Sequence, residues 1–222
     1  MNLPLSPYHK PGFYAEALAQ NRHRAIVGGR WEETGRAQMQ LLMDAGLQPQ
    51  HHLLDIGAGS LRLGCKAVPY LDQGHYWATD LSHALMQRGY QTELADPARL
   101  DPAHLIEDAD FNFPGIPATI THAIAFAVFT HLPLVCLNQS LAQIRSRFPR
   151  LQSLIVTVFI APPDRYDTAF RQPDGVVTHP DRAPYHHRAE QVLATAAAAG
   201  FQATLTDPIL PRGQRLCTAI PV

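Results

Sequence analysis

The stretch LLDIGAGSLRLG at residues 53–64 decides the fold of this chain. Its apolar start predicts a buried strand that stops at the turn Gly57-Ala58-Gly59. Glycine has no Cβ atom, so such a turn can adopt backbone angles closed to other residues, and a ligand can lie against bare backbone. A helix beginning near Ser60 would present free N–H groups to that ligand. The stretch therefore predicts a strand, a cofactor-binding turn and a helix, in that order.

The turn differs from the fingerprint of dinucleotide-binding proteins. That fingerprint reads G-x-G-x-x-G and places a diphosphate on the N-terminus of the helix. Here Arg62 occupies the third glycine position, and Gly64 comes two places late. Asp55, at the end of the strand, suits a cationic ligand better than a diphosphate, because like charges repel strongly in a low dielectric. S-adenosylmethionine, with a sulfonium, an ammonium group and no phosphate, meets this requirement.

A second acidic residue follows the next predicted strand. Residues 75–79 read HYWAT and are followed by Asp80 and Leu81. An acid in this place can accept hydrogen bonds from the hydroxyl groups of a ribose. The alternative is that Asp80 only caps a helix that begins at Leu81-Ser82. We expect the ribose role for Asp80, with Leu81 beside the cofactor.

Four segments of the chain resemble class I S-adenosylmethionine-dependent methyltransferases. They are GGRWEETGRAQMQLL (28–42), LLDIGAGSLRLG (53–64), HYWATDLS (75–82) and FAVFTHLP (126–133). GAGSLRLG together with VFTHL is similar to a bacterial branch of the family that acts on small molecules. The resemblance implies a Rossmann-like, doubly wound α/β fold, with a mostly parallel seven-stranded sheet and a terminal antiparallel hairpin.

The order of the predicted elements agrees with this fold. Helices are expected at 13–25, 31–45 and 189–199, and strands at 52–56, 75–79, 105–108, 121–127, 153–160, 201–206 and 214–220. We expect a single domain, 1–222. Its parts are an N-terminal helical cap (1–46), a cofactor-binding core (47–161), a substrate-facing loop (162–188) and a closing helix and hairpin (189–222).

Ligands of such sheets bind over the carboxyl ends of the strands, which selects further residues. The resemblance places Asp110 at the adenine ring; the alternative is that Asp110 only forms a turn. Phe126 and Ala127, at the end of the fourth strand, are expected to flank the cofactor. Arg62 either reaches the methionyl carboxylate of the cofactor or carries a solvated charge on the first helix.

Methyl transfer mainly requires an acceptor held in line with an already activated methyl group. A base helps when the acceptor is a hydroxyl or a protonated amine, and histidine suits this task near neutral pH. His131 is expected to be that base or a substrate ligand, unless its ring only fixes the loop. Tyr185 and His186 occupy the place of an aromatic-His pair in related sequences, so we expect them to contact the acceptor. His186 and His187 are adjacent, without the spacing of a metal site, so no metal is expected.

The segment before the sheet is rich in aromatic and charged residues. It includes Tyr8, Tyr14, Arg22, His23, Arg24 and Trp31. We expect it to fold over the cofactor as a cap. Its helices could equally form an oligomer surface or simply cover the sheet.

Composition sets further expectations. The net charge of −1 over 222 residues argues against a nucleic-acid partner. Three scattered cysteines favour a reduced, cytoplasmic location. The N-terminus has no apolar signal-peptide core, and the longest apolar run, 154–161, is too short to cross a membrane. Whether the protein is a monomer or a homodimer stays open.

These observations lead to one main hypothesis and two alternatives. The main hypothesis is an enzyme that moves a methyl group from S-adenosylmethionine to an oxygen or nitrogen of a small polar metabolite. The first alternative is a module that binds S-adenosylmethionine without turnover, as a sensor or partner subunit. The second is an NAD-dependent oxidoreductase, against which Arg62 in the third glycine position counts.

Overall fold

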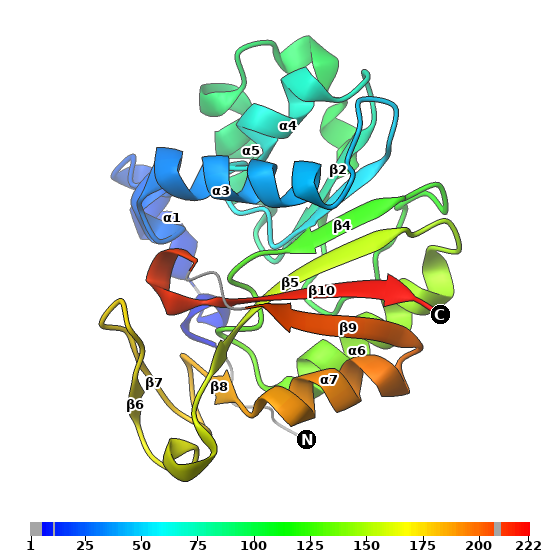
Figure 1. The fold of residues 1–222 in the computed structure, drawn as a ribbon. Helices are drawn as coiled ribbons and strands as arrows, with labels where there is room; N and C mark the ends of the chain where they lie inside the picture. The colour runs from blue at the N-terminus through cyan, green and yellow to red at the C-terminus, as the bar shows by residue number, and fades with distance from the viewer. Residues whose placement is uncertain (1–5, 11, 207–209) are drawn as a thin grey trace.

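The computed structural model describes residues 6–10, 12–206 and 210–222. Seven strands of its central sheet lie in the order β3-β2-β1-β4-β5-β10-β9 (Figure 1), and an eighth, β8 (His186–His187), pairs only with β5. The first five are parallel, and β10 runs antiparallel to both β5 and β9. The mostly parallel sheet with a closing hairpin is therefore confirmed. The strands are β1 (Leu53–Ile56), β2 (Tyr76–Asp80), β3 (Leu105–Glu107), β4 (His122–Ala125), β5 (Ser153–Ile160), β9 (Phe201–Thr206) and β10 (Arg215–Pro221).

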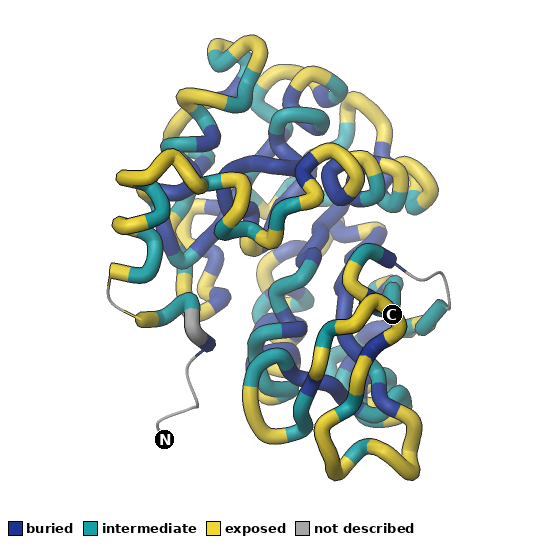
Figure 2. Tube along the Cα trace, turned by 90° about the vertical axis from the view of Figure 1, so that its left-hand side faces the viewer, coloured by how far each residue is buried: buried dark blue, intermediate teal, exposed yellow. Residues whose placement is uncertain are grey.

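Helices cover both faces of this sheet, as a doubly wound fold requires (Figure 1). The helices on one face are α3 (Trp31–Asp44), α4 (Gly64–Tyr70) and α5 (His83–Glu93). The helices on the other face are α6 (Leu134–Arg147) and α7 (Ala189–Ala198). Figure 2 shows the buried residues concentrated between these layers, with exposed residues along the outer turns.

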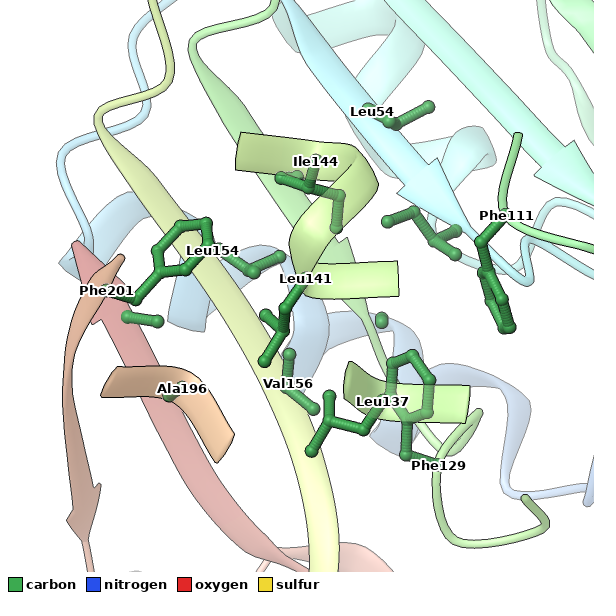
Figure 3. Packing of buried hydrophobic residues seen from close by; sticks show 14 of the residues in the cluster. Leu54, Phe111, Phe129, Leu137, Leu141, Ile144, Leu154, Val156, Ala196 and Phe201 are labelled. Carbon is green, nitrogen blue, oxygen red and sulfur yellow. The ribbon is translucent and has the colours of Figure 1, made fainter. Parts of the chain in front are cut away.

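The alternation of side chains along the strands divides the core in two. Leu53 packs with the residues of α3, α4 and α5, whereas its neighbour Leu54 packs on the opposite face. On that second face, Val156 of β5 lies with Leu141 of α6 and Ala196 of α7 (Figure 3). Both faces of the central strands are thus covered, which explains their nearly continuous apolar sequence.

The N-terminal segment differs from the expected single helix over 13–25. It forms two short helices, α1 (Phe13–Ala19) and α2 (His23–Ile26). Asn21 lies between them with φ 55°, a left-handed conformation that asparagine adopts more easily than most residues. The carboxylate of Glu93 on α5 then holds α2 in place. It accepts hydrogen bonds from Arg24 Nε (2.8 Å) and Nη2 (2.7 Å), and it lies 2.6 Å from His23 Nε2.

The expected loop at 162–188 contains short strands of its own. β6 (Phe170–Arg171) and β7 (Val177–Thr178) form a small hairpin, and β8 (His186–His187) pairs with the end of β5. The fourth strand is shorter than the predicted 121–127, because the chain turns at Ala127, where φ is 61°. Across the described ranges, no helix has the length and apolar character needed to span a membrane.

Gly89 gives a direct test of how α5 packs against the glycine-rich turn. A Cβ atom at Gly89 would overlap the backbone carbonyl group of Ser60. In an open helix, replacing glycine by alanine stabilises by roughly 1 kcal/mol. Here we expect Gly89→Ala to lower the free energy of unfolding by about 1–3 kcal/mol, since overpacking against fixed backbone is costly.

Chemical denaturation measures this change, and Gly35→Ala in α3 is the matched control. The atom nearest to a Cβ at Gly35 is the flexible Cε of Lys66, so we expect a smaller loss there. Equal losses for the two variants, or a gain for Gly89→Ala, would contradict the close packing of α5.

Candidate functional site

A cavity of about 330 Å³ lies over the carboxyl ends of β1, β2, β4 and β5. Its walls come from the strand ends, from the N-terminal segment, and from residues of the 162–188 segment and of the segment before β10. The strand-end lining includes Gly57, Gly59, Arg62, Asp80, Leu81, Phe126 and Ala127, and the N-terminal lining includes Tyr8, Tyr14, Val27, Thr34 and Gln38.

The turn after β1 needs glycine for two reasons. Gly57 and Gly59 both have left-handed backbone angles, with φ of 71° and 57°. A Cβ atom at Gly57 would also come within 2.5 Å of Val128 Cγ2, and one at Gly59 within 2.7 Å of Val27 Cγ1. The side chain of Val27, in the N-terminal segment, therefore lies so close to Gly59 that a Cβ atom at this position would clash with it.

Asp80 is buried at the end of β2, and its carboxylate lines the cavity. The N–H of Gly59 donates to Oδ2 (2.8 Å), and the N–H of Ser82 donates to Oδ1 (2.9 Å). Burial raises the pKa of Asp80 to about 6, although these N–H groups favour the charged form. Asp80 was the alternative candidate for the cap of α5, but the N-cap of this helix is Ser82. Its hydroxyl accepts a hydrogen bond from the N–H of Leu85 (3.3 Å).

Asp55 is also buried, but it is absent from the described lining of the cavity. The hydroxyl of Tyr76 donates to its Oδ2 at 2.7 Å. Burial raises the pKa of Asp55 to about 7, while Tyr76 and the charge of Arg62 act in the opposite direction. Its position gives no support to a direct contact between Asp55 and a ligand in the cavity.

Arg62 is buried and lines the cavity, so the predicted alternative of a solvated charge is wrong. Its Nη1 donates to the carbonyl oxygens of Val27 (2.9 Å) and Gly29 (3.2 Å), and its Nε donates to Gln38 Oε1 (3.4 Å). Burial lowers the pKa of Arg62 to about 10, which still leaves it charged at neutral pH.

Arg62 lies in the turn before α4, which begins at Gly64 and not near Ser60 as predicted, because Leu61 has a left-handed φ of 61°. This side chain fastens the N-terminal segment to that turn.

Phe126 and Ala127 line the cavity at the end of β4, as predicted. The N–H of Ala127 donates to Oγ1 of Thr157 (2.7 Å), and the hydroxyl of Thr157 donates to Oε1 of Gln214 (2.5 Å). Thr157 and Gln214 thus fix the backbone beside the site, although the sequence analysis did not select them. The available signal was a threonine inside the otherwise apolar strand SLIVTVFI.

His131 lines the cavity just beyond this turn. The edge of its ring meets Tyr8, with ring centroids 4.9 Å apart, and Tyr8 stacks on Tyr14. Burial lowers the pKa of His131 to about 4, so the imidazole is neutral at pH 7. Burial and the charge of Asp80 raise the pKa of both tyrosines, which therefore keep their protons.

Tyr185 and His186 lie outside the lining of the cavity. His186 is fully buried, and its ring nitrogens lie 2.8 Å from Thr178 Oγ1 and 2.8 Å from the carbonyl oxygen of Tyr166. The N–H of Tyr185 donates to the carbonyl oxygen of Thr130 (2.8 Å). Their positions do not support the predicted contact with an acceptor; both residues anchor the 162–188 segment beside β5.

Asp110 is exposed and is also absent from the lining. The turn after β3 is organised by Asp108, whose carboxylate accepts the N–H groups of Asp110 (3.1 Å), Asn112 (3.1 Å) and Phe113 (2.7 Å). The role of turn former therefore belongs to Asp108. In the part of the chain that the structure describes, no group of three or more His, Cys, Asp or Glu is arranged to hold a metal ion.

Solved structures with the same fold include several methyltransferases. Magnesium protoporphyrin IX methyltransferase from Synechocystis PCC 6803, with bound S-adenosylhomocysteine, matches at TM-score 0.64 and 15% identity over 94% of this chain and 96% of that one. An O-methyltransferase family protein from Burkholderia thailandensis matches at 0.62 and 10%, over 94% and 62%. The glycopeptide N-methyltransferase MtfA matches at 0.60 and 13%, over 85% and 90%.

No protein-family model matches the chain. At these identities the similarity shows the fold alone. The chain has the Rossmann-like fold of class I methyltransferases.

The buried carboxyl group of Asp55 predicts a specific dependence of stability on pH. Between pH 4 and 7 the folded state keeps a proton on Asp55 that the unfolded state has lost. The contribution of Asp55 to stability therefore falls as pH rises, at a slope of up to about 1.4 kcal/mol per pH unit. Asp55→Asn removes this slope, so we expect the variant to gain stability relative to the unaltered protein as pH rises from 4.5 to about 6.5.

Urea denaturation at several pH values measures the difference between the two proteins. Asp72→Asn changes an exposed aspartate in the same way and serves as the control. If the curves of the Asp55→Asn variant and the unaltered protein stay parallel over this range, Asp55 is not ionising in a buried environment.

Proposed function

We propose that this protein transfers a methyl group from S-adenosylmethionine to an oxygen or nitrogen of a small molecule. The observation that carries the proposal is that the bare glycine turn and Asp80 line the same cavity. Its volume of about 330 Å³ lies within the range of roughly 300–1,000 Å³ found for small-molecule sites. The methyltransferase fold of the chain agrees with this function.

The residues around the cavity fit the adenosyl cofactor. When bound, S-adenosylmethionine supplies a methyl group already activated by the positive sulfur. Asp80 would accept hydrogen bonds from the ribose hydroxyls, and Leu81, Phe126 and Ala127 would flank the nucleoside. Arg62 would face the methionyl carboxylate of the cofactor.

The site holds acidic and basic side chains, which suit a ligand that carries charges of both signs, such as S-adenosylmethionine. Asp80 lines the cavity, and Asp55 lies buried beneath the same turn. Arg62 is positive and lines the same cavity, where it suits the carboxylate of S-adenosylmethionine. Arg62 in the third glycine position counts against NAD, whose diphosphate requires the G-x-G-x-x-G turn.

The acceptor side of the proposal rests on His131. Its neutral imidazole can accept a hydrogen bond from an acceptor hydroxyl, and it orients that group. Tyr8 and Tyr14 line the cavity beside His131, and Tyr8 contacts the His131 ring. A module that binds the cofactor without turnover would share the cofactor contacts but would not depend on His131.

Calorimetric titration with S-adenosylhomocysteine tests the proposal. We expect binding to the unaltered protein and at least a tenfold loss of affinity for Asp80→Asn, because an amide cannot replace both acceptor oxygens of the carboxylate. Asp72→Asn, a change at an exposed aspartate, should bind like the unaltered protein.

Transfer of label from methyl-labelled S-adenosylmethionine to a metabolite extract then separates the enzyme from a binding module. If S-adenosylhomocysteine does not bind and NAD does, the proposal is wrong.

A further inference from the structure

The cavity has a second end, beyond the carboxyl ends of β4 and β5. In the order of the sheet, Asp80 on β2 and the turn after β1 lie at one side of the cavity, and β5 and β10 lie at the other. The lining of this second side is mostly apolar: Leu132, Phe159, Val176, Pro184 and Pro211. We refer to these five residues as the acceptor wall.

Polar groups beside the acceptor wall already have partners. Gln214 accepts from Thr157 (2.5 Å) and donates to the carbonyl oxygen of Pro211 (3.3 Å). The hydroxyl of Thr130 donates to the carbonyl oxygen of Ala127 (3.0 Å). These side chains therefore shape the wall but are occupied within the protein.

The charged groups near this end are hydrogen-bonded within the protein, and Arg212, which lines the cavity, is exposed. Arg212 donates through Nη2 to the carbonyl oxygen of Gly28 (2.8 Å). Asp174 forms an ion pair with Arg30 (3.0 Å) and accepts the backbone N–H of Arg212 (2.9 Å). Among the described residues, Asp80 is the acid that lines the cavity, and it lies at the opposite side. A cationic acceptor would find no counter-charge at the acceptor wall, and desolvating its charge there would be unfavourable.

His131 is the polar side chain next to the acceptor wall that suits a neutral ligand. Its ring lies nearly perpendicular to the ring of Tyr8, and His131 lines the cavity together with Leu132. A neutral imidazole offers one acceptor nitrogen and one N–H donor. A hydroxyl group can satisfy that acceptor, while the apolar wall takes up a ring.

We propose that the acceptor wall takes an uncharged, ring-sized apolar molecule that carries a hydroxyl group, of which a simple phenol is the model. This inference rests on the proposed function, since it names the class of methyl acceptor. It replaces the polar metabolite expected from the sequence, because the wall offers five apolar side chains, and Arg212, the charged residue beside them, is exposed and hydrogen-bonded within the protein. Specificity then depends on the absence of a charge at positions such as Val176.

Three probes of equal ring size but different charge test the proposal: 4-methylphenol, benzylamine and benzoate. Their binding to the protein saturated with S-adenosylhomocysteine is measured by ligand-observed NMR titration. We expect 4-methylphenol to bind at least tenfold more tightly than either charged probe. Preference for a charged probe, or no binding of any of the three, would overturn the proposal.

Val176→Asp places a carboxylate on the acceptor wall in a half-buried position. We expect this variant to lose at least tenfold in affinity for 4-methylphenol and to gain affinity for benzylamine. Val177→Asp is the matched control, since Val177 is an exposed neighbour outside the lining. Equal effects of the two substitutions would contradict the role of the wall.

Binding of S-adenosylhomocysteine, measured separately, distinguishes the two ideas. If the protein does not bind S-adenosylhomocysteine, the proposed function is wrong. If it holds while the phenol preference is absent, only the acceptor class is wrong.

Discussion

The site depends on the hydrogen bonds that the buried guanidinium of Arg62 donates to the N-terminal segment. A buried charge is tolerated only when it is paired and hydrogen-bonded. Two carbonyl oxygens of the N-terminal segment, at Val27 and Gly29, provide that pairing, and the charge of Asp55 lies close enough to favour the cation. The segment and the glycine turn are therefore one structural unit. Without the segment, the strand ends would face solvent and Arg62 would lose its partners.

The two acids of the site have different tasks. Asp80 faces the cavity while its oxygens hold the backbone of Gly59 and Ser82. Asp55 lies beneath the turn, bound to Tyr76. Burial raises the pKa of both toward neutrality. A cationic ligand in the cavity would favour the charged forms of both acids, so ligand binding and the ionisation of these carboxyl groups are coupled.

The sequence was sufficient for the features that depend on local pattern. The segment 53–64 predicted the strand, the turn and the cofactor end of the site, because glycine spacing and strand ends are local properties. It was not sufficient for contacts made by distant segments. Thr157 and Gln214 meet across 57 residues, and His186 belongs to a strand that pairs with β5 only in the folded chain. Asp55 shows a third limit, since its place at a strand end did not reveal that its side chain points to Tyr76.

A crystal structure with S-adenosylhomocysteine tests most directly that the N-terminal segment and the strand ends form one ligand cavity. We predict that the ligand lies between them, in contact with Asp80 and the turn at Gly57–Gly59 on one side and with Tyr8 or Val27 on the other. A ligand bound elsewhere, or bound at the strand ends with the N-terminal segment displaced from it, would contradict this account.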